Sequence, residues 1–108
     1  MSRKLIVTRM KEVRKGWSYR GFDFLVELDE VLIGMVRDGE TVSFPISEQE
    51  QFLEILPRNG RRKPSWCAII PAGKEDCSVS VCPYTNREPT VELASAAQNP
   101  QFDEQDRF

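Results

Sequence analysis

Histidine is absent from the sequence, and its absence limits the chemistry that the chain can perform. Histidine is the commonest general base and the usual partner of a serine or cysteine nucleophile. A carboxylate pair or a lone lysine could still catalyse a reaction, but no spacing of acidic or basic residues favours either. The sequence therefore predicts a protein that is not an enzyme.

Cysteine is scarce, with only Cys67, Cys77 and Cys82 in the chain. An odd number of cysteines in a sequence without a secretion signal argues against a disulfide framework. A zinc site needs four ligands from cysteine, histidine or carboxylate, and these cysteines have no CxxC spacing. We expect three reduced, partly buried thiols and neither a metal nor another cofactor.

Long apolar stretches are also missing. The longest nearly apolar run, Val31 to Val36, is far shorter than the roughly 20 residues of a membrane span. The first seven residues place two basic side chains before three apolar ones, whereas a signal peptide has an apolar region of about 7–15 residues. The sequence therefore predicts a soluble cytosolic protein, and its length of 108 residues fits one domain.

Alternation with a period of two is the clearest pattern in the chain. Phe22, Phe24, Val26 and Leu28 alternate with residues that are polar except for Leu25. This pattern is typical of a half-buried strand with its aromatic side chains toward the core. Further strands are expected at 3–15, 31–37, 40–44, 66–71, 77–84 and 89–93.

Two local signals connect these strands. Asp38-Gly39 lies between two β-rich runs and predicts a tight hairpin with a type I′ turn. Pro45 is expected to end the second strand of that hairpin. Ser47 and Glu50 then have the spacing of a capping box, which predicts a helix over about residues 47–56 with an apolar face.

Together these elements predict an α+β fold, mainly an antiparallel β-sheet with one helix at about 47–56. Residues 1–93 would form one globular β-rich domain. Residues 94–108 combine small and polar residues with Pro100 and acidic groups, so we expect a disordered acidic tail. Whether the β-rich blocks before and after the helix share one sheet stays open at this stage.

Charge is unevenly distributed along the chain, although the net charge is only −2. Seven of the first 20 residues are basic and only one is acidic, and a second basic segment follows the helix. One interpretation is a solvated strand with protective charges at its edge. The other is an anion-binding face for nucleic acid, in which aromatic rings stack on bases between cations. The candidate contacts are Arg9, Lys11, Arg14, Lys15, Trp17, Tyr19, Arg20, Arg61, Arg62 and Lys63.

The C-terminal residues combine aromatic rings with carboxylates, as in Phe102, Asp103, Glu104, Asp106 and Phe108. This segment resembles the acidic tails of bacterial and phage single-stranded-DNA-binding proteins, which also end in phenylalanine. The resemblance implies that the tail docks on a replication, repair or host protein and competes with DNA for the basic face. The alternative is a charged tail that only adds solubility.

The predicted order of four strands and one helix, with Ile46-Ser47 leading into Glu48-Gln49, is similar to the positive-cofactor-four family of single-stranded-DNA-binding coactivators. The resemblance covers roughly residues 5–56. It implies a curved antiparallel sheet and a helix that supports a homodimer.

These observations lead to two hypotheses from different classes. The first is a non-catalytic protein from a phage or bacterium that binds single-stranded nucleic acid, DNA or RNA. The second is a small phage or bacterial protein that binds a host enzyme as an inhibitor or adaptor. A sheet edge or the acidic tail would make that contact.

Overall fold

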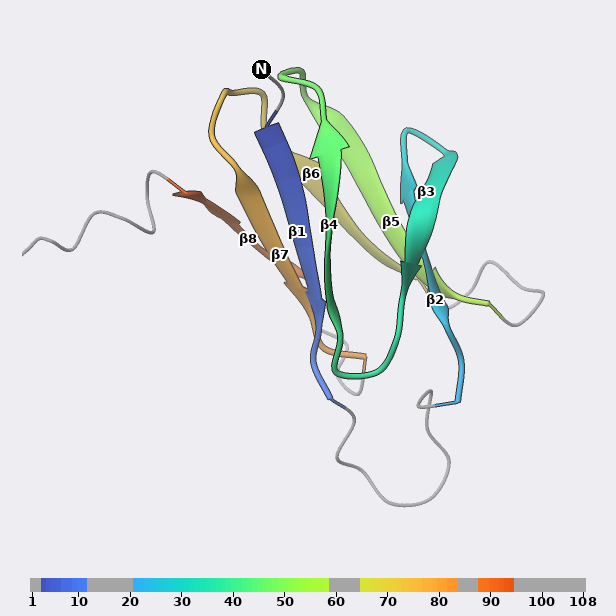
Figure 1. Ribbon diagram of the computed structural model, residues 1–108. Helices are drawn as coiled ribbons and strands as arrows, with labels where there is room; N and C mark the ends of the chain where they lie inside the picture. The colour runs from blue at the N-terminus through green and yellow to red at the C-terminus, as the bar shows by residue number, and fades with distance from the viewer. Residues whose placement is uncertain (1–2, 12–20, 59–64, 84–87, 95–108) are drawn as a thin grey trace, which may run out of the picture.

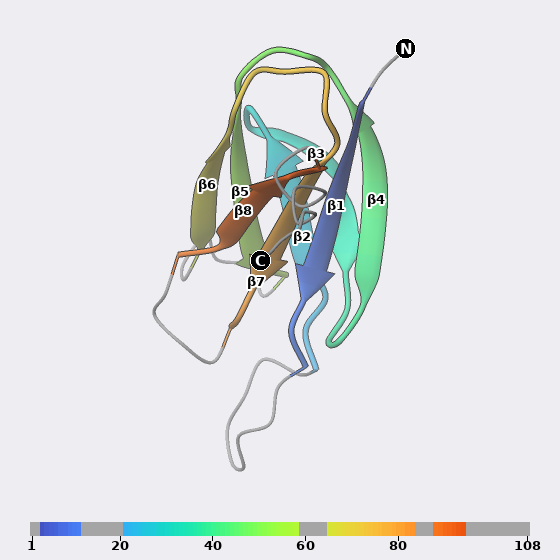
Figure 2. The same cartoon turned by 90° about the vertical axis from the view of Figure 1, so that its left-hand side faces the viewer.

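The structure is a computed structural model, and it describes residues 3–11, 21–58, 65–83 and 88–94. Within these residues, two four-stranded sheets pack face to face as a β-sandwich (Figures 1 and 2). Sheet A has the strand order β4-β1-β7-β8, and sheet B has the order β3-β2-β5-β6. All neighbouring strands are antiparallel except β1 and β7. The strands are β1 Arg3–Arg9, β2 Phe24–Leu28, β3 Val31–Val36, β4 Thr41–Ile46, β5 Gln51–Pro57, β6 Trp66–Ile70, β7 Cys77–Val81 and β8 Thr90–Leu93.

The core lies between the two sheets and follows the period of two along each strand. In β2, the predicted inward residues Phe24, Val26 and Leu28 are buried. Leu53 and Ile55 of β5 are fully buried as well. Apolar side chains from every second position of both sheets therefore form one cluster, as expected for two packed sheets.

The predicted α+β class is wrong, because the described part of the chain contains strands and no helix: the fold is all-β. The residues of the expected helix form the loop 47–50 and strand β5. Ser47 does not cap a helix: its hydroxyl accepts a hydrogen bond from the Gln49 amide at 3.2 Å and donates to Gln51 Oε1 at 3.3 Å. β5 is held on both sides, by β2 and by β6, so sheet pairing overrides the helical pattern.

The Asp38-Gly39 turn exists, but it does not close a hairpin. The Glu40 amide donates to the Arg37 carbonyl at 3.0 Å, yet β3 and β4 belong to different sheets. Gly39 has a positive φ of 74° and Asp38 does not, which excludes a type I′ turn and matches the Gly position of a type II turn. The turn therefore carries the chain from one sheet to the other.

The tight two-residue hairpin lies elsewhere, between β2 and β3. Asp29 and Glu30 have φ values of 49° and 68°, and Leu28 pairs with Val31. Two successive positive φ values are the signature of the type I′ turn. Asp29 tolerates this conformation well, and its carboxylate also accepts a hydrogen bond from the Phe52 amide at 2.9 Å.

Pro45 does not end β4, which continues to Ile46. Among the described strands, β4 lies at the edge of sheet A and pairs with β1 alone. The Arg9 amide donates a hydrogen bond to the Glu40 carbonyl, and the Met10 amide donates to the Val81 carbonyl. The backbone groups of odd residues in β1 therefore face β4, and those of even residues face β7. Lys4 pairs with Pro45, so the proline nitrogen faces the free edge, where a missing N–H removes no ladder hydrogen bond.

The β-rich blocks before and after residue 47 do not form separate sheets. Each sheet contains strands from both blocks, and the chain crosses from sheet B to sheet A between β3 and β4 and again between β6 and β7. No helix in the described ranges is long and apolar enough to cross a membrane. Residues 95–108, which include most of the predicted tail, lie outside the described residues.

Candidate functional site

Three connections meet at one end of the sandwich. β1 ends and β2 begins there, β5 ends and β6 begins there, and β7 ends and β8 begins there (Figure 1, lower end). The turn from Arg37 to Glu40 lies at the same end. Connections at one end of a β-sandwich are a common place for binding residues, because the rigid sheets hold their anchor points together.

This end, which we call the basic end, carries exposed cations in the described residues. Lys11 follows β1, Arg37 follows β3 and Arg58 follows β5, and all three are exposed. Arg37 lies 3.8 Å from the Asp23 carboxylate, yet its side chain is 80% exposed and can reach other anions. The other described acidic residues of this end are Asp38, Glu40 and Glu88, so the name basic end depends on the basic residues that the sequence places in the connections β1–β2 and β5–β6.

Most of the predicted nucleic-acid contacts belong to two of the connections at the basic end. They lie in residues 12–20 and 59–64, outside the described residues, and only Arg9 and Lys11 can be placed. The remaining predicted contacts are Arg14, Lys15, Trp17, Tyr19, Arg20, Arg61, Arg62 and Lys63. The fold thus brings the anchor points of both basic segments to the same end, which their separation in the sequence does not reveal.

Arg9 lies in the core and not on the surface. Its side chain is fully buried, and Nη1 donates to the carbonyls of Phe22 at 2.7 Å and Val36 at 3.2 Å. Its guanidinium carbon lies 3.7 Å from the ring centroid of Phe24. The Phe24 ring also stacks on the ring of Trp66, with 5.2 Å between their centroids. A buried guanidinium held in this way is not available to a phosphate, so we remove Arg9 from the proposed contact.

The opposite end of the sandwich is acidic. Three turns meet there, β2–β3, β4–β5 and β6–β7. The described cations at this end are exposed Lys4 and Lys74 and buried Arg3. The acidic residues that define this acidic end are Asp29, Glu30, Glu48, Glu50, Glu75 and Asp76.

Arg3 holds the acidic end together from inside. Its side chain is 2% exposed, and it donates to the carbonyls of Ser47 at 2.8 Å, Gln49 at 3.1 Å and Pro71 at 2.6 Å. These bonds tie the β4–β5 loop to the β6–β7 loop. The sequence signal for the inward positions of Arg3 and Arg9 is parity, because they share the odd positions of β1 with buried Leu5 and Val7.

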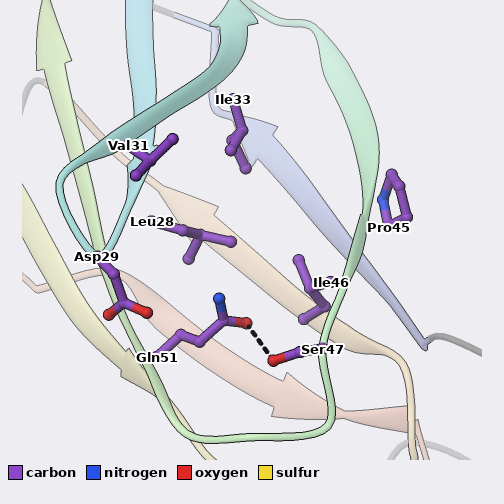
Figure 3. Close-up of a pocket in the computed structure, with 8 residues that line it drawn as sticks. All are labelled: Leu28, Asp29, Val31, Ile33, Pro45, Ile46, Ser47 and Gln51. Carbon is purple, nitrogen blue, oxygen red and sulfur yellow. Dashed lines mark hydrogen bonds between the residues drawn. The ribbon is translucent and has the colours of Figure 1, made fainter.

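A groove opens beside the β4–β5 loop, between the edges of the two sheets. β3 and β4 splay apart toward the acidic end, and side chains from both line a volume of about 510 Å³ (Figure 3). We call this the edge groove. Nothing in the sequence predicted it, because β3 and β4 were expected to pair. Its lining residues are Leu28, Asp29, Val31, Ile33, Pro45, Ile46, Ser47 and Gln51.

The outer face of sheet B carries several large apolar side chains, and Glu27 and Glu54 lie among them on the same face. Leu25 pairs with Met35 on one side and with Leu56 on the other, and Phe52 pairs with Ile69. Ile69 is 51% exposed and Leu32 is 56% exposed. Large exposed apolar residues on one face are a mark of an interaction surface. The apolar face of sheet B consists of Leu25, Leu32, Met35, Phe52 and Ile69.

The three cysteines differ in burial. Cys77 is fully buried, and burial raises the pKa of its thiol above the ordinary value of 9.0, with Arg3 acting in the opposite direction. A raised pKa lowers the thiolate fraction at neutral pH, and the thiolate is the reactive form. Cys67 and Cys82 are free thiols of intermediate exposure. Within the described ranges, no three cysteine, aspartate or glutamate side chains come together to hold a metal ion.

Known proteins offer no analogy. Comparison with protein-family models, curated proteins and solved structures found no match. The charges and surfaces of this sandwich are therefore the guide to its function.

Proposed function

We propose that the protein binds single-stranded nucleic acid through the basic end, without catalysis and in the cytosol. The main support is one observation. The two basic segments of the sequence join β1 to β2 and β5 to β6 at the end of the sandwich where Lys11, Arg37 and Arg58 are exposed. The acidic end lies at the other extreme of the sandwich. This division of charge would orient the molecule toward a polyanion although its net charge is negative.

The proposed contact combines two kinds of interaction. Exposed lysine and arginine side chains neutralise phosphates, and aromatic residues stack on unpaired bases. Among the described residues, the cations that we assign to the contact are Lys11, Arg37 and Arg58. The aromatic residues of the proposal, Trp17 and Tyr19, belong to the connection between β1 and β2.

Fluorescence anisotropy with a labelled dT oligomer tests this proposal. We expect binding at low salt that weakens steeply as salt rises, with a slope of about −0.7 per neutralised phosphate. The combined variant Lys11→Ala, Arg37→Ala, Arg58→Ala should bind more weakly and flatten that slope by about 2, because it removes up to three phosphate contacts.

The matched control is the variant Lys4→Ala, Lys74→Ala, which removes exposed cations from the acidic end. It should bind the oligomer as the wild type does. Absence of binding at about 50 mM salt, or an equal loss in both variants, would contradict the proposal.

A second candidate function is protein binding, and the apolar face of sheet B favours it. A soluble protein rarely leaves this many large apolar side chains on one sheet face without a partner. In this alternative the protein acts as an adaptor or inhibitor of another protein.

A nuclease-treated pull-down tests this alternative. We expect the wild type to retain one stoichiometric protein from a bacterial lysate, and Ile69→Lys combined with Met35→Lys to lose it. Ser78→Lys, on the outer face of sheet A, is the control and should retain it. Capture of the same proteins by all three forms would contradict a role for this face.

A further inference from the structure

The edge groove has apolar walls and one polar end. Leu28, Val31 and Ile33 come from sheet B, and Pro45 and Ile46 come from sheet A (Figure 3). Its volume of about 510 Å³ falls within the range of small-molecule sites, roughly 300–1,000 Å³. An aliphatic chain between these walls would bury apolar surface on both sides.

The polar end of the groove presents oxygen atoms of Asp29 and Ser47 and the side-chain amide of Gln51. The Asp29 carboxylate is fixed by its hydrogen bond from the Phe52 amide, and the Ser47 hydroxyl donates its hydrogen to Gln51 Oε1 (Figure 3, dashed line). The Asp29 carboxylate and the Ser47 oxygen keep lone pairs that can accept hydrogen bonds, whereas the Gln51 amide nitrogen, a donor, points away from Ser47 toward the groove (Figure 3). Exposed Glu30 and Glu50 lie next in sequence to Asp29 and Gln51 and add negative charge.

Both strands that border the groove are poor templates for an added strand. On β4, Pro45 places a nitrogen without hydrogen on the free edge. On β3, the pairing with β2 shifts between Val26 and Glu27, so that Ile33 is an extra, bulged residue. A proline and a bulge both oppose edge-to-edge pairing. The groove therefore suits a compact ligand better than an extended peptide.

We propose that the edge groove binds a small amphipathic primary amine. The aliphatic chain lies between β3 and β4, and the ammonium group donates to Asp29, with Ser47 as a further acceptor. An ammonium group has three donors and no acceptor, which matches this set of oxygens. The site lies at the acidic end, so it is separate from the proposed nucleic-acid contact.

Titration with n-octylammonium at submicellar concentration tests the proposal, with octanol and octanoate as probes of equal chain length. Methyl NMR signals of Leu28, Val31, Ile33 and Ile46 report occupancy. We expect saturable shifts with n-octylammonium, at least about tenfold weaker binding of octanol, and no saturation with octanoate, since a hydrogen bond to a charged group is worth about 1.5–3 kcal/mol. Equal binding of all three probes, or no saturable shift with n-octylammonium, would overturn the proposal.

Asp29→Asn separates charge from structure. Asparagine tolerates the positive φ of the turn and can accept the Phe52 amide hydrogen bond, so the fold should persist. We expect this variant to bind n-octylammonium about tenfold more weakly. Val31→Lys, at a wall position of β3 that is 62% exposed, should abolish binding. Ser43→Lys, on β4 but outside the groove lining, should not change binding. Undiminished binding by Asp29→Asn would refute the assigned role of the carboxylate.

Discussion

Replacing Arg9 with alanine should lower the free energy of unfolding by about 3–4 kcal/mol. The variant leaves the buried carbonyls of Phe22 and Val36 without this donor and removes the cation from the face of Phe24. It also removes the aliphatic stem of a side chain that is fully buried. Urea unfolding followed by tryptophan fluorescence measures the loss, since Trp66 stacks directly on Phe24.

Two further variants locate the cause. Arg9→Lys keeps the charge but replaces a planar fork by a point charge, so we expect an intermediate loss of about 1–2 kcal/mol. Lys11→Ala removes an exposed cation two residues away and should change stability by less than about 0.5 kcal/mol. If Arg9→Ala and Lys11→Ala were equally stable, the core role of Arg9 would be wrong. Arg9→Lys should also leave the salt dependence of oligonucleotide binding unchanged, because Arg9 is no longer part of the proposed contact.

The Arg9 result shows where sequence reasoning about the site failed. A basic residue beside other basic residues is expected at the surface, because arginine is almost never fully buried without a partner. The partners here are the backbone carbonyls of Phe22, before β2, and Val36, the last residue of β3, and only the tertiary fold brings them to Arg9. The alternation along β1 carried the opposite signal, since Leu5 and Val7 have the same parity as Arg9.

The strands were predictable wherever local pattern determines them. Phe24, Val26 and Leu28 alternate over a length that has no competing interpretation, and they form the inner face of β2. In β5 the pattern is ambiguous, because Leu53 and Ile55 face the core while Phe52 and Leu56 lie on the other face. A short run that is apolar on both faces also fits one side of a helix. Pairing with β2 and β6 decides the outcome, and that information is not local.

Sheet membership was not predictable for the same reason. The Asp38-Gly39 turn has the same local chemistry whether the next strand pairs with β3 or crosses to the other sheet. The crossing separates β3 from β4 and so opens the edge groove. The directions of the strands place the two basic connections, β1–β2 and β5–β6, at one end of the sandwich. The features that carry both proposals therefore arise from topology, which a single sequence specifies only through its global packing.

The close approach of β3 to β4 at Phe44 depends on a glycine, and this gives the second large expected effect. A Cβ atom added at Gly34 would lie 2.9 Å from Phe44 Cζ and closer still to Phe44 Cε1. Phe44 is on β4, so the contact joins the facing edges of the two sheets. Gly34→Ala should therefore destabilise the protein by about 1–3 kcal/mol through overpacking, measured by urea unfolding.

Two comparisons show whether the ring of Phe44 is the cause. Gly21→Ala adds a Cβ with no atom within 4 Å and should be neutral or slightly stabilising. The double variant Gly34→Ala, Phe44→Leu shortens the side chain that the new methyl group meets, so its loss should be smaller than the sum of the two single losses by about 1 kcal/mol or more. Strict additivity of the two substitutions would show that the contact between the sheet edges does not require glycine. Loss of additivity would show that the close approach of β3 and β4 near Phe44, from which the edge groove opens toward the acidic end, is set by these two residues.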